Sequence, residues 1–473
     1  YMFLLLLIAL ILIGTSRLTG INRATVAIAL AAIGWVIYVS WGADFVAVNH
    51  LPDYWKYLGG NSPTSETVKQ FIHDNIFIVY VGHAASLALY LLATGTIVKI
   101  LEQNGCLDFI VYLCRTASAR QMLWRLVAVS FFISANLDNL TTTLLMLTVL
   151  RQLTDNRRER WLLGTAVVVA ACMGGCFTVI GDPIGLLLWG QGAVTATAFS
   201  ARLALPAVTA CIIVTLMLSR KLPHRITGSR QVLPYRGNDT RLRPWQRTAM
   251  LFTALVGLWF VPTFYNITHL SPFLGAMCVL AILWVVNEAF NRRLFQADQM
   301  TTPYRHRAVI LDSYAQLLYV LGWLLAMGVM KEAAVFDDLG HMLASLHMDG
   351  IWSIGILSGM LSSVTDSTAI AMCDVSLHGV LSHADLQHMA VNSNLWGSGS
   401  YMSQFLTDGD YWPVVVLCTT MGGLLLPIGN MSGLALMATE QLHPWWYIRH
   451  CTPALAIATC TAFIILFFEN LLF

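Results

Sequence analysis

The sequence predicts an all-α polytopic membrane protein made of two inverted repeats, each with a re-entrant helical hairpin and a broken transmembrane helix. Composition, the spacing of apolar segments and a motif that occurs twice support this prediction. Of the 473 residues, 57% are hydrophobic and only 11% are charged, whereas a soluble domain carries about 25% charged residues. Because so few charged residues cannot cover the surface of a soluble protein of this size, most of the surface of this chain must face lipid. The net charge of +2 gives no reason to expect a nucleic-acid partner.

The predicted membrane spans are apolar segments near the roughly 20 residues that a helix needs to cross a bilayer. They are 2–15, 22–42, 75–100, 161–190, 201–219, 248–265, 273–290, 309–330, 411–439 and 451–472. Two other apolar stretches, 126–150 and 351–373, are interrupted by polar residues, SANLDNLTTT from Ser134 and SSVTDST from Ser362. We expect each of these two stretches to be a re-entrant hairpin whose polar tip reaches the middle of the membrane.

Basic residues are distributed unevenly between the two sides of the predicted spans. All of the 27 lysines and arginines except Lys56, Lys69, Arg202 and Lys331 fall on one side. This side comprises 15–23, 99–125, 151–160, 220–247, 291–308 and 441–450. The positive-inside rule makes these segments, including the basic loops 151–160, 220–247 and 291–308, cytoplasmic. Hairpin 126–150 then enters from the cytoplasm and hairpin 351–373 from outside. The loop 220–247 either enforces this topology or binds a partner or anionic lipid.

An internal repeat supports the same architecture. Residues 173–188 (MGGCFTVIGDPIGLLL) align without gaps with residues 421–436 (MGGLLLPIGNMSGLAL). The equivalent polar pairs are Asp182 with Asn430, Ser134 with Ser362, and Asp138 with Asp366. Because the charge pattern puts the hairpins on opposite faces, the repeats are expected to be inverted. Inverted repeats with helices broken at the midplane are the architecture of secondary transporters.

The predicted breaks carry the residues that are candidates for ion binding. An aspartate at the membrane centre costs about 2.5–3.5 kcal/mol, so it needs a partner or a purpose. Hard cations prefer several oxygen ligands, and burial disfavours a charged carboxylate, so a proton and a cation can compete for one site. The candidate ion-binding residues are Asp138, Asn139, Asn136, Thr141, Thr142, Asp182, Ser363, Asp366, Ser367 and Asn430. The alternative is that the aspartates only cap half-helices.

Other charged residues are expected to have no special role. Asp408 and Asp410 precede the span at 411 and are predicted to be solvated, and Lys331 and Glu332 to be surface charges. The polar stretch 392–400 is either an external loop or lines a cavity. The sequence contains no nucleophile–base motif, CxxC pair or phosphate loop, so no enzyme activity and no cofactor is expected.

Several segments resemble a known family of transporters. SANLDNLTTTLLMLTVLRQL, GGCFTVIGDP, LLATGTIVKILEQNG and ILSGMLSSVTDSTAIA are similar to signature segments of NhaD-type sodium/proton antiporters. These antiporters belong to the ion transporter superfamily, together with arsenite permeases and sodium/dicarboxylate symporters. The resemblance runs from about residue 75 to the end. It departs from the family pattern at Lys99, at Pro183–Gly185, at Asp366–Ala369 and at Asn430–Met431.

The resemblance implies a homodimer in which a transport part of each protomer moves against a scaffold part, as in an elevator. Na⁺ or Li⁺ would leave the cytoplasm in exchange for H⁺, with Asp138 as the shared cation and proton site and Asp366 as a second sodium ligand. The transported ions would be the small-molecule partners, and the bacterial inner membrane the location. The departures keep two alternatives open: a cation-coupled anion carrier on the same fold, and a non-transporting membrane paralogue that acts in a complex.

The predicted domain organisation follows the repeats. Residues 1–74 form N-terminal helices and an outer interfacial loop. Residues 75–219 form the first repeat, with hairpin 126–150 and broken helix 161–190. The basic loop 220–247 separates it from the second repeat, 248–473, with hairpin 351–373 and broken helix 411–439.

Overall fold

The computed structural model contains helices and, among the residues that it describes, no strand. The described residues are 2–106, 108–116, 118–223, 242–291, 306–345, 350–378, 380 and 403–472. Most of the basic loops 220–247 and 291–308, and all of 392–400, lie outside these ranges. Their predicted location therefore stays a prediction.

Seven described helices or helix pairs are long and apolar enough to cross a membrane. They are α3 (Arg23–Ser40), α6 (Ser65–Phe71) continued through a π-turn into α7 (Ile78–Gln103), α11 (Arg157–Cys176), α13 (Ala196–Ser219), α14 (Pro244–Thr268), α15 (Pro272–Asn291) and α25 (Thr452–Leu472). The pair α16 (His306–Glu332) and α17 (Val335–Ser345) would add one span, but it is bent by 73°. The chain is thus a multi-pass membrane protein.

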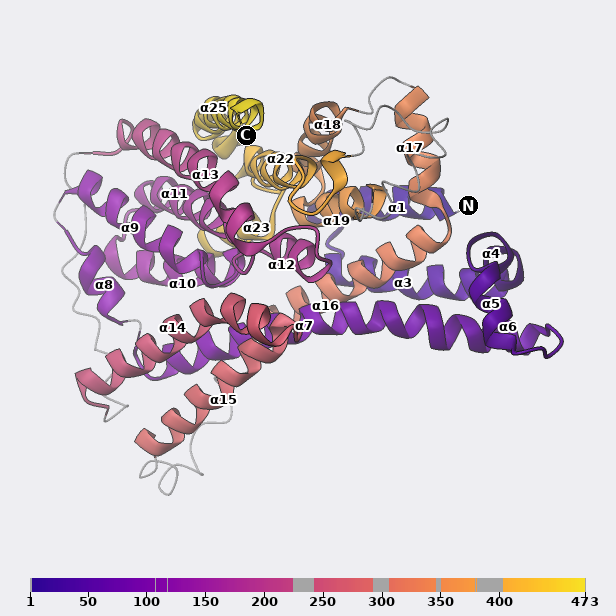
Figure 1. The fold of residues 1–473 in the computed structure, drawn as a ribbon. Coiled ribbons are helices and arrows are strands. Elements are labelled where there is room, and N and C mark those ends of the chain that lie inside the picture. The colour runs from indigo at the N-terminus through magenta and orange to yellow at the C-terminus, as the bar shows by residue number, and fades with distance from the viewer. Residues whose placement is uncertain are drawn as a thin grey trace. The chain divides into compact units, whose positions relative to one another are not determined.

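The contacts divide the chain into two compact units, which we describe separately. The first unit comprises Tyr1–Leu89, His306–Ser353 and Met372–Gly379. Its centre is the long contact between α3 and α16, which lie side by side in Figure 1. Close approach is possible because small residues lie in this contact: a Cβ atom on Gly34 would collide with Val329. The Trp35 indole then donates across the contact to the Leu325 carbonyl at 3.1 Å.

Glu332 ends α16 in this unit, and its carboxylate is mostly buried. The side chain is 12% exposed and contacts His50 Nε2 at 2.6 Å. The hydroxyl of Tyr80 donates to it at 2.8 Å, and that of Tyr38 at 3.5 Å. The prediction that Glu332 is a surface charge was therefore wrong. The charge is buried because its partners come from α3, α7 and the start of α5 (Leu51–Leu58), far away along the chain.

The second unit contains the polar breaks of both predicted hairpins and both predicted broken helices. In each of the four stretches, one helix ends and another begins within a few residues (Figure 1). The pairs are α9 (Ala119–Ser134) with α10 (Asn139–Leu153), α11 with α12 (Pro183–Gly190), α18 (Ile351–Val364) with α19 (Ser367–His378), and α22 (Tyr411–Leu425) with α23 (Met431–Glu440). The ends of α18 and α19 farthest from their break belong to the first unit.

The α11 helix is the centre of the second unit, since it packs against α9, α10, α13, α22 and α23. Of the most apolar part of α11, 89% is buried inside the protein. This part is rich in Ala, Val and Gly, and such small residues allow helix backbones to approach closely. A Cβ atom on Gly174 would collide with the Phe131 carbonyl of α9. At the equivalent position of the other repeat, a Cβ atom on Gly422 would collide with the Gly359 carbonyl of α18.

Ion pairs and hydrogen bonds connect the ends of several of these helices. The Glu440 carboxylate at the end of α23 is 1% exposed and accepts from Arg151 and Arg160, each at 2.7 Å. Asp408 accepts from the backbone and hydroxyl of Thr195 at 2.6 and 2.9 Å, and Asp410 pairs with Arg202. Both aspartates stay partly exposed, as expected for solvated residues, and each also has a partner within the protein.

Replacement of Gly174 or Gly422 by alanine should lower the thermal stability of the protein in detergent. Inserted atoms in a packed core cost about 1–3 kcal/mol, and the colliding atoms here are backbone carbonyls, which cannot turn aside. Gly95→Ala is the matched control, because a Cβ atom at this helical position meets nothing within 4 Å. It should leave stability unchanged or raised, since alanine favours helix more than glycine does. Equal melting curves for all three variants would contradict the packing described above.

Candidate functional site

The polar residues at the four helix breaks act as caps of the following half-helix. Asp138 accepts from the Thr141 amide at 3.0 Å at the start of α10. Asp182 accepts from the Ile184 amide at 3.1 Å at the start of α12. Capping satisfies amide groups that the first turn of a helix leaves without a partner. Asp138 and Asp182 therefore both cap a half-helix, as the alternative interpretation of the sequence predicts.

The second repeat makes the same contacts with different residues. Asp366 accepts from the Ala369 amide at 3.2 Å at the start of α19. At the start of α23, Asn430 accepts from the Gly433 amide at 2.5 Å and donates to the Gly423 carbonyl at 2.8 Å. The break of α22 and α23 is joined to the α18–α19 break by a bond from the Ser367 amide to the Gly429 carbonyl at 2.9 Å.

Contacts that hold the breaks in place also correspond between the repeats. The Ser134 hydroxyl donates to the Ala171 carbonyl at 2.6 Å, and the Ser362 hydroxyl donates to the Thr419 carbonyl at 2.6 Å. Donors and acceptors of these two bonds are equivalent in the alignment of the repeats. The two motifs are therefore similar in their side-chain contacts as well as in their sequence.

Three carboxylates from different breaks come together in the second unit. Asp138, Asp182 and Asp366 are 6%, 4% and 0% exposed. Asp182 interacts electrostatically with both of the others. The Asn139 amide group links two of the breaks, because its Nδ2 donates to Asp182 Oδ2 at 3.1 Å. The site thus concentrates negative charge away from water.

Buried oxygen atoms without a hydrogen-bond partner flank Asp138. Among the described residues, they include Asn136 Oδ1, Thr142 Oγ1 and Thr143 Oγ1. A buried polar group without a partner costs about 1–3 kcal/mol, so three of them together suggest that the site binds something further. All three are neutral oxygens, which suit a hard cation together with a carboxylate.

Some predicted site residues have a more local role. The Ser363 hydroxyl, which is half-buried, donates back to the Met360 carbonyl of its own helix at 2.7 Å. Thr141 contributes its backbone amide to Asp138. Ser367 is 8% exposed and ties two breaks together through its backbone.

Sequence reasoning missed Tyr90 of α7. Its side chain is 2% exposed, its hydroxyl lacks a hydrogen-bond partner among the described residues, and it interacts electrostatically with Asp138. Nothing in the apolar run around it distinguishes this tyrosine from a packing residue. Thr143 belongs to the same threonine run as Thr141 and Thr142, and its hydroxyl also lacks a hydrogen-bond partner among the described residues.

Comparison with known proteins identifies the family of the chain. A family model described as citrate transporter (CitMHS) matches residues 2–398. Sodium/proton antiporter 2 of Arabidopsis thaliana is 26% identical over 373 residues, which cover 78% of this chain and 81% of that protein. Sodium/proton antiporter 1 of the same plant is 26% identical over 369 residues, and the match covers 78% of this chain but only 59% of the relative's length.

A bacterial relative extends the comparison. The Na⁺/H⁺ antiporter NhaD of Vibrio cholerae is 24% identical over 409 residues, which cover 81% of this chain and 77% of the relative. The resemblance to NhaD-type antiporters is thereby confirmed. The family description and these names are those of transporters and not of enzymes. The chain belongs to the citrate transporter family of membrane proteins.

Proposed function

We propose that this protein is a secondary active transporter that exchanges Na⁺ or Li⁺ for H⁺. The observation that carries the proposal is the group of buried carboxylates beside buried oxygens that lack a hydrogen-bond partner. The names of the relatives, sodium/proton antiporters from a plant and NhaD from a bacterium, support the choice of ions.

The cation would bind beside Asp138. Capping uses Oδ2 of this carboxylate, and a carboxylate has acceptor sites on both oxygens, so capping and cation binding are compatible. Asn136, Thr142 and Thr143 would add neutral oxygens. Asp182 and Asp366 would add negative potential, and the second would also be a ligand. A proton on Asp138 would remove the charge that holds the cation, so the two ions would exclude each other, as exchange requires.

We infer that the two repeats are inverted and that their breaks move together in an elevator-type cycle. The equivalent bonds of Ser134 and Ser362 support a common origin of the repeats, and the uneven distribution of basic residues supports their opposite orientation. In this proposal 75–219 and 248–473 are the repeats, and 126–150 and 351–373 are re-entrant. A homodimer in a bacterial inner membrane is part of the same proposal.

A second candidate is a cation-coupled anion carrier, because the matching family is described as citrate transporter. The amide-rich starts of half-helices favour anions. Three neighbouring carboxylates would repel an anion, however, and the caps by Asp138, Asp182 and Asp366 each already occupy an amide. We therefore place the carrier reading second.

Substitution of Asp138 by asparagine should abolish exchange without unfolding the protein. Asparagine caps helices as well as aspartate does, so the variant removes the charge and keeps the cap. In liposomes with an internal pH dye, a sodium gradient should move protons with the natural protein but not with the variant. Asp155→Asn, an exposed aspartate just after α10, is the control and should exchange normally. Exchange by Asp138→Asn would overturn the site, and sodium-driven citrate uptake instead of proton movement would favour the second candidate.

Replacement of Thr142 by valine should weaken cation binding while the fold stays intact. The lost oxygen is one ligand of a charged group, worth about 1.5–3 kcal/mol, so the apparent affinity for Na⁺ should fall about 10- to 100-fold. Since this hydroxyl has no hydrogen-bond partner in the described part of the chain, its removal should leave the melting temperature unchanged or higher. Thr148→Val is the control on the same helix, because this exposed hydroxyl only donates to Leu144. A lower melting temperature with unchanged affinity would make Thr142 a structural residue.

Proton competition predicts a specific dependence on pH. As the pH falls, the apparent affinity for Na⁺ should decrease by up to tenfold for each unit of pH, because a proton on the shared carboxyl excludes the cation. At higher pH, where protons no longer compete, the affinity should level off. Rates at saturating sodium should vary much less. A rate that collapses on acidification while the affinity stays constant would show that the proton acts at another group.

A further inference from the structure

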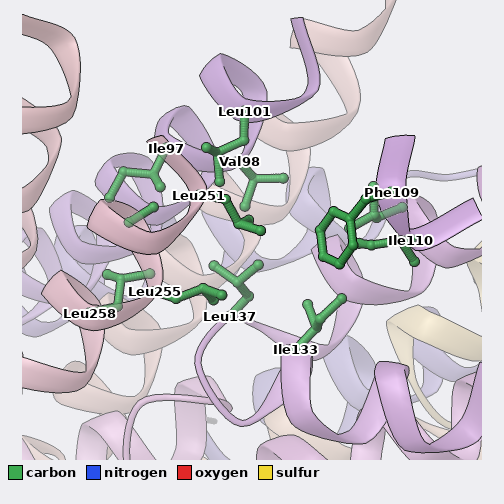
Figure 2. Close-up of a pocket in the computed structure, with 12 residues that line it drawn as sticks. Ile97, Val98, Leu101, Phe109, Ile110, Ile133, Leu137, Leu251, Leu255 and Leu258 are labelled. Carbon is green, nitrogen blue, oxygen red and sulfur yellow. The ribbon is translucent and has the colours of Figure 1, made fainter. Parts of the chain in front are cut away.

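An apolar pocket in the second unit reaches the same hairpin from another direction. Its lining comes from α7, α8 (Asp108–Cys114), α14, α10 and the region around the α9–α10 break. Figure 2 shows Leu101, Phe109, Ile133, Leu137, Leu251 and Leu255 directed toward one space. The pocket is small, with about 50 Å³ of space inside this lining, and it opens on one side.

The lining contains only hydrocarbon side chains. Phe109 is 50% exposed and so places the mouth of the pocket at the protein surface. In a membrane protein, this surface faces lipid, so the natural occupant is an acyl chain and not water. Exposed Tyr112 and Leu113, which follow on α8, continue the apolar surface.

Basic and aromatic side chains lie close along the chain to the lining residues of α14 and near the end of α8. Arg243 precedes α14, and Arg247 lies one helical turn before the lining residue Leu251. Arg125 of α9 reaches the end of α8, since its Nη1 donates to the Leu113 carbonyl at 2.9 Å. Beside these arginines, Trp124 and Trp245 are 38% and 59% exposed. Tryptophan marks the level of the lipid headgroups, so the cations lie at the depth of the phosphates.

We propose that this pocket binds one acyl chain of an anionic phospholipid whose headgroup lies on Arg243, Arg247 and Arg125. The apolar lining suits the chain, and the charge of the rim suits the phosphate. Basic pockets between membrane helices are known to select anionic lipids.

The occupied pocket would act on the link between α9 and α10. Leu137 lines the pocket and is followed directly by Asp138. An acyl chain against Leu137 would therefore restrain the backbone that carries the carboxylate. This consequence rests on the proposed function, but the binding itself does not, and binding can be measured without an ion gradient.

Photo-crosslinking of the full chain tests the site. The purified protein in phosphatidylcholine nanodiscs would receive phosphatidylglycerol with a diazirine in its acyl chain, followed by peptide mapping. We expect label on α8 and on the 251–258 segment of α14, and unlabelled phosphatidylglycerol should compete it away. Ala254→Phe should fill the pocket and remove most of the label. Val256→Phe, which adds the same ring on an exposed part of the same helix, should keep it.

The headgroup is tested with charge variants. Arg243→Gln should reduce the preference for phosphatidylglycerol over a diazirine phosphatidylcholine by about fivefold, as expected for the loss of one cation near the surface. Arg158→Gln, an exposed arginine at the start of α11, should not. Uniform labelling that unlabelled lipid does not compete away, equal labelling by both headgroups, or crosslinks to a second copy of the chain at these helices would each overturn the proposal.

Discussion

The requirement that every backbone polar group in a membrane has a partner determines where this chain can break its helices. Four breaks lie in the second unit, and each is followed by a capping side chain that accepts from the next turn. In hydrocarbon, an uncapped break would cost several kcal/mol for each exposed group. Breaks are therefore tolerated only where protein surrounds them, and the same confinement brings Asp138, Asp182 and Asp366 together.

One difference between the repeats separates capping from ion binding. Asp182 and Asn430 occupy equivalent positions, and both cap the following half-helix. Asparagine thus shows within this chain that the cap needs no charge. A carboxylate in a buried site is more costly than an amide, so capping alone does not account for three aspartates. Their negative charge needs a counter-ion or a proton, and the proposed exchange would supply the two in turn.

The sequence alone predicted the breaks, since polar residues and glycines interrupt otherwise apolar runs, and the motif repeat predicted which positions are equivalent. Local patterns did not reveal partners from distant helices. The sequence predicts a surface charge at Glu332 because its partners His50, Tyr38 and Tyr80 are far away along the chain. The sequence gives no sign that Tyr90 is more than a packing residue, because tyrosines are common in apolar helices. Both errors concern side chains whose role depends on packing between helices.

The α9–α10 link connects two different environments through neighbouring residues. Leu137 faces the apolar pocket, while Asp138 belongs to the carboxylate cluster. A link of so few residues cannot move one side chain without moving the other, because the ends of both helices fix its backbone and Asp138 also caps α10. Binding of a cation at the proposed site and packing of a lipid in the proposed pocket would both act on one short segment. Any change that shifts this segment in response to a bound lipid would then also change the energy of the proposed cation site, and the reverse follows by thermodynamic linkage.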